Sequence, residues 1–275
     1  MKKSAVLLSV LLFAGACNPD TSDDSDTDRD RNLSSSQIQE QDPEDDNNDF
    51  DEEEAPGHQG IELRLIDAFH LDINLTEGQT WAFDYHQDAP NHTQVKSPDN
   101  TTYTASDAVK EVEGLVTRIS VSRRHSAESI IDAITDALNT DSSSLEDMTF
   151  SLEMSNGEQY AFATQKFQKD QDPDSMDSFS LELGFYSGES FEITYNRSNG
   201  TAFIVPVEGP AESGSETASE LDDYLNDLDI SYDDSFQKLQ ETVLDPLGFH
   251  QNDVEKMLLA IEFDNEDTFE FQHVY

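Results

Sequence analysis

The chain has 275 residues, of which 60 are acidic and 15 are basic, so its formal charge is −45 at pH 7. This balance argues against a nucleic-acid partner, because phosphate backbones are held by clustered Lys and Arg, and the basic cluster SRRH at 122–125 is too small to offset the acidic field. One cysteine in the whole chain excludes a disulfide framework and thiol catalysis in the folded part.

Residues 1–17, MKKSAVLLSVLLFAGAC, have the pattern of a secretory signal peptide. Their apolar core, from Ala5 to Phe13, is too short for a transmembrane helix, which needs roughly 20 residues. The small residues before Cys17 resemble a bacterial lipobox, so we expect cleavage before Cys17 and lipidation of its thiol. Ala14 stands where lipoboxes most often have Leu, which leaves cleavage by an ordinary signal peptidase as the alternative. Acyl chains on Cys17 would hold the protein at the cell membrane, facing outside the cytoplasm, without a spanning helix.

Residues 18–60 are dominated by Asp, Glu, Ser, Asn and Gln. Such a segment buries too little apolar surface to offset its ordering entropy, so we predict a disordered acidic tether. The alternating acids Asp26, Asp28 and Asp30 resemble a calcium loop, but the glycine and the bidentate Glu of such a loop are missing at their offsets. We therefore interpret this run as solvated charge rather than as a metal site.

The first folded pattern is a two-stranded hairpin, FHLDINLTEGQTWAFDY at 69–85, in which apolar residues alternate around a Gly-centred turn. Nearly the same pattern returns as FSLELGFYSGESFEITY at 179–195, an offset of 110 residues. A third strand is expected at 201–207, with a weaker counterpart near 92–96.

Each hairpin precedes two predicted amphipathic helices, whose apolar residues recur at steps of three and four. The helices are expected at 106–119, 126–139, 217–230 and 236–247. Ser106 and Thr217 are the predicted N-caps of the first helix in each repeat, and Pro246 and Gly248 mark the end of the last helix.

Both repeats end in a closing hairpin. LEDMTFSLEMSNGEQYAF at 145–162 aligns with VEKMLLAIEFDNEDTFEF at 254–271, an offset of 109 residues, and Asn156-Gly157 predicts a type I′ turn. A tandem duplication explains why two separate segments agree at each apolar position.

These patterns predict an α+β protein made of two tandem repeats, each an antiparallel sheet (hairpin, third strand and closing hairpin) packed on a pair of helices. The first repeat is expected at 61–168 and the second at 177–275. We expect them to form adjacent domains with limited freedom, joined by the short polar segment KDQDPDSMD.

The lipoprotein signal, the acidic spacer, the Phe-x-Leu-x-Ile hairpin, the helices EVEGLVTRI and IIDAITDAL and the hairpin FSLEMSNGEQYAF resemble the YusW-like family of extracytoplasmic bacterial proteins. Here the pattern occurs twice. The resemblance implies a location outside the cytoplasm and this fold, and it carries over no catalytic or ligand residue.

The residues that could carry chemistry lack the spacing that chemistry requires. The seven histidines form no H-E-x-x-H motif, so we interpret them as surface residues and predict no metal ligand and no cofactor. Trp81, Tyr85, Phe191 and Tyr195 could stack on a sugar or peptide, but their alternation favours packing in the core. No serine lies in G-x-S-x-G, and carboxylate pairs are expected at random in so acidic a chain, so we predict no catalytic residue and no enzyme activity.

Two classes of function remain. The first is a membrane-anchored extracytoplasmic lipoprotein that acts as a non-enzymatic binding or interaction module at the cell envelope, with an envelope protein, a peptide or a wall component as its partner. The alternative is a protein for weak cation binding or for salt and stress adaptation, which acts through its acidic surface.

Overall fold

The computed structural model describes residues 60–76, 78–165 and 176–275. The predicted signal peptide, Cys17 and the tether as far as residue 59 lie outside the described residues. The described part is α+β, as predicted, with a mixed order of strands and helices in which every strand pair is antiparallel.

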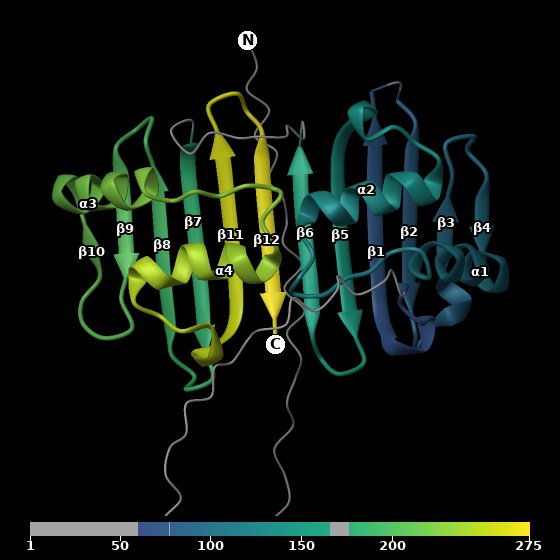
Figure 1. The fold of residues 1–275 in the computed structure, drawn as a ribbon, viewed down its shortest axis with the longest axis horizontal. Helices are drawn as coiled ribbons and strands as arrows, with labels where there is room; N and C mark the ends of the chain where they lie inside the picture. Colours follow the sequence, from purple (N-terminus) through teal and green to yellow (C-terminus); the bar gives the residue numbers. More distant parts are fainter. Residues whose placement is uncertain (1–59, 77, 166–175) are drawn as a thin grey trace, which may run out of the picture. The chain divides into compact units, whose positions relative to one another are not determined.

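The strands form one twelve-stranded sheet (Figure 1). The strands of the first repeat are β1 (Ile66–Leu75), β2 (Thr80–His86), β3 (Gln94–Lys96), β4 (Thr102–Thr104), β5 (Leu145–Met154) and β6 (Gln159–Gln165). Those of the second repeat are β7 (Met176–Phe185), β8 (Ser190–Asn196), β9 (Thr201–Val205), β10 (Glu212–Ser213), β11 (Val254–Phe263) and β12 (Thr268–Val274). Their order in the sheet is β10-β9-β8-β7-β11-β12-β6-β5-β1-β2-β3-β4, so both repeats have the same order when read outward from the centre.

The two repeats share this sheet, whereas the sequence predicted a separate sheet for each. β6 and β12 pair antiparallel along their length, and Phe162 pairs with Phe271. The two sheets join because each closing hairpin ends in a long edge strand. The unpaired backbone N–H and C=O groups of such a strand can form hydrogen bonds with another strand. Phe162 and Phe271 are also equivalent residues at the offset of 109, so the two repeats are related by an approximate two-fold axis that passes between them.

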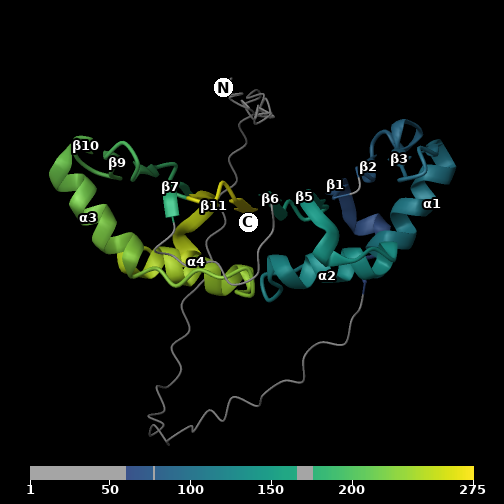
Figure 2. The same cartoon turned by 90° about the horizontal axis from the view of Figure 1, so that it is seen from above.

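Among the described residues, four α-helices cover one face of the sheet (Figure 2). They are α1 (Ala105–Val116), α2 (Ala127–Leu138), α3 (Ser215–Asn226) and α4 (Phe236–Leu244). α2 buries Ile130, Ile131 and Ile134, and the facing side of β1 buries Phe69 and Leu71. The core therefore lies between the helices and the alternate residues of the strands that face them.

The predicted N-caps of the first helices are wrong. α1 begins after Thr104, so that Ser106 lies inside the helix, and α3 begins after Gly214, so that Thr217 is a buried residue of its first turn. A true cap is found on α2, where the Ser126 side chain accepts a hydrogen bond from the Ser129 backbone N–H at 3.1 Å. The chain enters both of these helices almost directly from a strand, β4 or β10, so each helix begins before the polar residue that stands nearest the apolar periodicity.

The turn at Asn156-Gly157 is also of a different type from the one predicted. Gly157 has a φ of 90°, but Asn156 is not left-handed, whereas a type I′ turn needs both residues at positive φ. The Gly157 N–H donates to the Met154 carbonyl at 2.8 Å, and the Met154 N–H donates to the Glu158 carbonyl at 2.8 Å. This is a type I turn followed by a left-handed residue, the other common way to close a short hairpin.

A second contact between the repeats lies among the helices. The Glu128 N–H donates to the Tyr232 carbonyl at 3.1 Å, and the Gln237 N–H donates to the Arg123 carbonyl at 2.8 Å. These two bonds are equivalent at the offset of 109, because residue 128 corresponds to 237 and residue 123 to 232. The repeats are therefore joined both through the sheet and through the loops that lead into α2 and α4.

Candidate functional site

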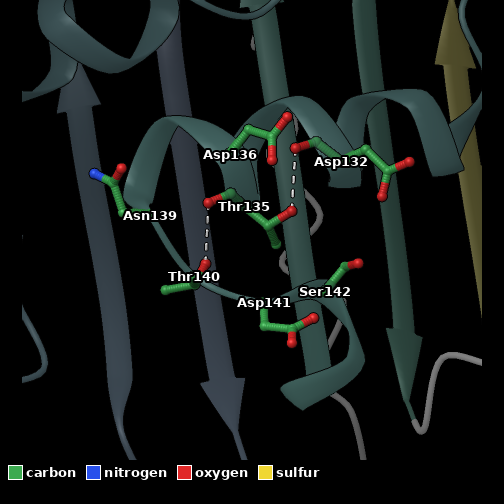
Figure 3. Close-up of a pocket in the computed structure, with 7 residues that line it drawn as sticks. All are labelled: Asp132, Thr135, Asp136, Asn139, Thr140, Asp141 and Ser142. Carbon is green, nitrogen blue, oxygen red and sulfur yellow. Dashed lines mark hydrogen bonds between the residues drawn. The ribbon is translucent and has the colours of Figure 1, made fainter.

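An open hollow of about 590 Å³ lies at the carboxyl end of α2 (Figure 3). Its lining is polar and comes from the last turns of α2 and the loop that follows. The lining residues are Asp132, Thr135, Asp136, Asn139, Thr140, Asp141 and Ser142.

Local hydrogen bonds hold the loop that forms this hollow. Asn139 ends α2 in the left-handed conformation, at a φ of 53°, which turns the chain back along the helix. The Thr140 hydroxyl donates to the Thr135 carbonyl at 3.3 Å. The Asp141 carboxylate accepts the backbone N–H of Ser143 at 2.9 Å, so the loop is fixed before any ligand arrives.

The pKa values of two carboxyl groups around the hollow are shifted in opposite directions. Burial raises the pKa of Asp132, and the nearby Asp136 and Asp233 add to the effect. Hydrogen bonds from Ser143 lower the pKa of Asp141. A cation near Asp132 would relieve the repulsion among these carboxylates. In the described ranges, however, no three side chains of His, Cys, Asp or Glu are grouped as a metal ion requires.

A second polar feature lies on the helix-free face, where His70, Asp72, Asp84 and His86 meet across β1 and β2. The His70 Nε2 is 3.1 Å from Asp72 Oδ2, and Asp84 Oδ1 is 4.0 Å from His70 Nδ1 and 3.7 Å from His86 Nε2. The hydrogen bond to Asp72 raises the pKa of His70, and burial acts in the opposite direction. The equivalent positions of the second repeat carry no histidine, so this cluster belongs to the first repeat alone.

The histidines and aromatic residues singled out in the sequence have different surroundings. His86, His92 and His250 are exposed, as predicted for surface histidines, but His273 is fully buried, so that prediction was wrong for it. Of the four aromatic residues predicted to pack in the core, three are buried there, which confirms the prediction for Tyr85, Phe191 and Tyr195. Trp81 is half-buried and stacks on Phe83 at 5.8 Å between ring centroids.

One serine has a spacing that the sequence reasoning missed. Ser235 and Lys238 have the S-x-x-K spacing of a nucleophilic serine and its lysine base. The Ser235 hydroxyl instead accepts the backbone N–H of Lys238 at 3.1 Å and caps α4. The motif is therefore explained by helix capping, the role that Ser126 has in α2.

The predicted lipid-attachment residue, Cys17, lies outside the described residues. None of the helices in the described ranges is both long enough and apolar enough to cross a lipid bilayer.

The fold and these sites define an α+β protein in which two related halves share one antiparallel sheet. The model of the family described as "YusW-like protein" matches residues 67–156 and, separately, residues 177–265. Because the matches cover more than half of the chain, the protein belongs to the YusW-like family, with the family unit present twice. Comparisons with curated proteins and with solved structures returned no match.

Proposed function

We propose that this protein is a non-enzymatic binding module of the cell envelope and that its binding surface is the helix-free face of the sheet. The observation that carries the proposal is the placement of α1 to α4 on one face of the sheet (Figure 2), which leaves the alternate side chains of both repeats on the other face. Thr149 on β5 and Glu182, Glu192 and Thr194 on β7 and β8 are exposed residues of this kind.

Such a face suits recognition for a physical reason. The hydrogen-bonded backbone of a sheet keeps its Cβ atoms in fixed positions, so little backbone entropy is lost when a partner binds and only the exposed side chains must be ordered. The face carries carboxylates, hydroxyl groups and the cluster around His70, and these groups would recognise an envelope protein, a peptide or a wall component through polar contacts. Lipidation of Cys17 at the outer side of the membrane is part of this proposal, because it would hold the face close to such partners.

The binding surface can be tested by pull-down from a cell-envelope extract and by co-sedimentation with purified cell wall. Thr149→Arg and Thr194→Arg place a bulky cation on the helix-free face of each repeat. Ser219→Arg, at an exposed position of α3, is the matched control on the helix side. Partner capture that is lost with the two threonine variants and kept with the control would support the proposal, and unchanged or absent specific capture would refute it.

The anchor can be tested separately from the surface. Mass spectrometry of the mature N-terminus should find acyl chains on Cys17, and Cys17→Ser should move the protein from the membrane fraction to the soluble fraction. An unmodified N-terminus elsewhere would show cleavage by an ordinary signal peptidase and would refute the lipid anchor.

The alternative function, weak cation binding, has one observation in its favour. Burial raises the pKa of Asp132 at the α2 hollow, and repulsion from Asp136 and Asp233 adds to the effect. Calorimetry with Ca²⁺ should then show saturable heat that is lost in Asp132→Asn combined with Asp136→Asn. Heat that is lost instead on deletion of 18–60 would locate the cations on the acidic segment, and the absence of saturable heat would exclude both.

A further inference from the structure

The two repeats differ where they meet. About the central pair Phe162 and Phe271, Tyr160 pairs with His273 on one side. At the equivalent place on the other side, Thr164 pairs with Phe269. The duplicated scaffold therefore explains the pairing of the strands, but it does not explain a histidine in the core at one of the two places.

His273 is held on both of its ring nitrogens. It lies on β12 and has no exposed surface. Its Nδ1 is 2.8 Å from the amide nitrogen of Gln240 on α4, and its Nε2 is 3.4 Å from a carboxylate oxygen of Glu158, which belongs to the first repeat. The imidazole stacks on Tyr160, at 4.7 Å between ring centroids, and contacts the tilted ring of Tyr275 at 4.2 Å. One side chain thus connects α4, β12 and the other repeat.

The hydrogen-bond network assigns the proton on this ring. The Tyr275 hydroxyl donates to the amide oxygen of Gln240 at 2.8 Å, so the amide nitrogen of Gln240 is the group that faces His273. Because an amide N–H₂ only donates, Nδ1 of His273 accepts and carries no proton. The proton is then on Nε2, which faces Glu158, and the ring is neutral.

The surroundings of the ring contain one acid and one permanent cation. Burial lowers the pKa of His273, Glu158 raises it in part, and Arg123 lowers it further. Arg123 reaches this place from the loop before α2, with its guanidinium 4.9 Å from the ring centroid of Tyr275. The phenols of Tyr160 and Tyr275 have raised pKa values and stay neutral. α4 contributes the uncharged Gln240, and β11 contributes its register partner, Met257.

We propose that His273 makes the junction of the two repeats sensitive to acid: protonation of Nδ1 breaks the hydrogen bond from Gln240 and loosens α4 from β12. A proton on Nδ1 points a donor at the amide N–H₂ of Gln240, so two donors face each other across 2.8 Å. Rotation of the Gln240 amide would turn its oxygen toward Nδ1 and let its nitrogen donate to the Tyr275 hydroxyl. The cost that rotation cannot relieve is the charge of the protonated imidazole at a position with no exposed surface. The Glu158 contact on Nε2 remains, so the effect falls on the α4 side of the ring.

The sign of the effect follows from linkage. The folded pKa is lowered, so the closed junction is fully stable above the ordinary histidine value of 6.5 and loses stability as the pH falls below it. The opening equilibrium should increase by up to about tenfold per pH unit, the limit for one proton.

The experiment is hydrogen exchange read by mass spectrometry on the full chain, at a series of pH values between about 7.5 and 5, corrected for the intrinsic exchange rate. Peptides that cover α4 and β12 should open more as the pH falls, while those of β1 should not. His273→Gln should remove this pH dependence, and His250→Gln, at an exposed position, should keep it.

A second variant keeps the proposal open to refutation if His273→Gln does not fold. Gln240→Glu offers Nδ1 an acceptor that pairs with the protonated ring, so α4 should stay closed at acidic pH. The proposal is overturned if the opening of α4 and β12 depends on pH as strongly in His273→Gln or in Gln240→Glu as in the wild type. It is also overturned if neither element responds to pH in the wild type, because a merely structural histidine would give that result.

Discussion

Phe271 at the centre of the shared sheet offers a direct test of how the two repeats are held together. Its side chain is 2% exposed. It pairs with Leu259 on β11 and with Phe162 on β6, and its ring centroid is 5.0 Å from that of Phe236 on α4. Phe271→Ala removes a large ring from a place that strands on both sides and a helix above keep from collapsing.

The expected loss is large compared with the stability of a domain. Buried Phe→Ala changes cost about 3–5 kcal/mol, and the limited room for collapse suggests a value near 4 kcal/mol. Because domains unfold with about 5–15 kcal/mol, this one change should remove a substantial part of the total. The matched control is Phe203→Ala on β9, whose side chain is 43% exposed and which should cost less than about 1 kcal/mol.

Urea unfolding followed by far-UV circular dichroism measures both quantities. The wild type should unfold in one transition, because β6 and β12 make the repeats parts of one sheet, and Phe271→Ala should lower the midpoint. Two resolved transitions in the wild type, or a loss no larger than that of Phe203→Ala, would refute the reasoning that the repeats share one cooperative core.

Four further changes have outcomes that the structure predicts. The pKa of His70 is raised chiefly by its hydrogen bond with Asp72, so its contribution to stability is present below the ordinary value of 6.5 and is lost as the pH rises through the folded value. His70→Asn should flatten the dependence of Tm on pH in that range, and an unchanged slope would exclude the contribution. Ser126→Ala removes the cap of α2 and should lower the unfolding free energy by about 1 kcal/mol in urea titrations, whereas no loss would mean that the cap is not needed. Gly157→Ala, at a φ of 90°, should cost about 1 kcal/mol by the same assay. Gly114→Ala, in α1 with open space around the new Cβ, should gain up to about 1 kcal/mol, and a gain at both glycines would contradict the left-handed turn.

The strands and helices could be predicted from the spacing of apolar residues. Burial of one face places them at every second residue of a strand and at steps of three and four in a helix. The strand expected at 201–207 is β9, at Thr201–Val205, and its weaker counterpart is β3, at Gln94–Lys96. Alternation reports which face of a strand is buried, and it contains no information on which strand lies alongside. Phe162 and Phe271 would be buried whether their strands formed a sheet edge or paired with each other. The joining of the repeats was therefore beyond the reach of the pattern.

The buried histidine was missed, although the sequence holds a signal for it. Phe269, Phe271 and His273 follow one another at steps of two along the closing strand, so they share its inward face. The prediction of surface histidines rests on metal-binding spacing, and that spacing contains no information about burial. The partners Gln240 and Glu158 could not have been identified from the sequence, because they come from a helix and from the other repeat, and only the fold brings them together.

The strand order also gives a physical reason for two copies in one chain. The outer edges of the sheet are short, because β4 has three residues and β10 has two. The edges that meet in the middle are longer, since β6 and β12 each have seven residues. A repeat on its own would leave such a long edge unpaired, and an open edge of this length invites association with other chains. The second copy covers the edge of the first, so duplication places the long edges inside the molecule and leaves the short ones at its ends.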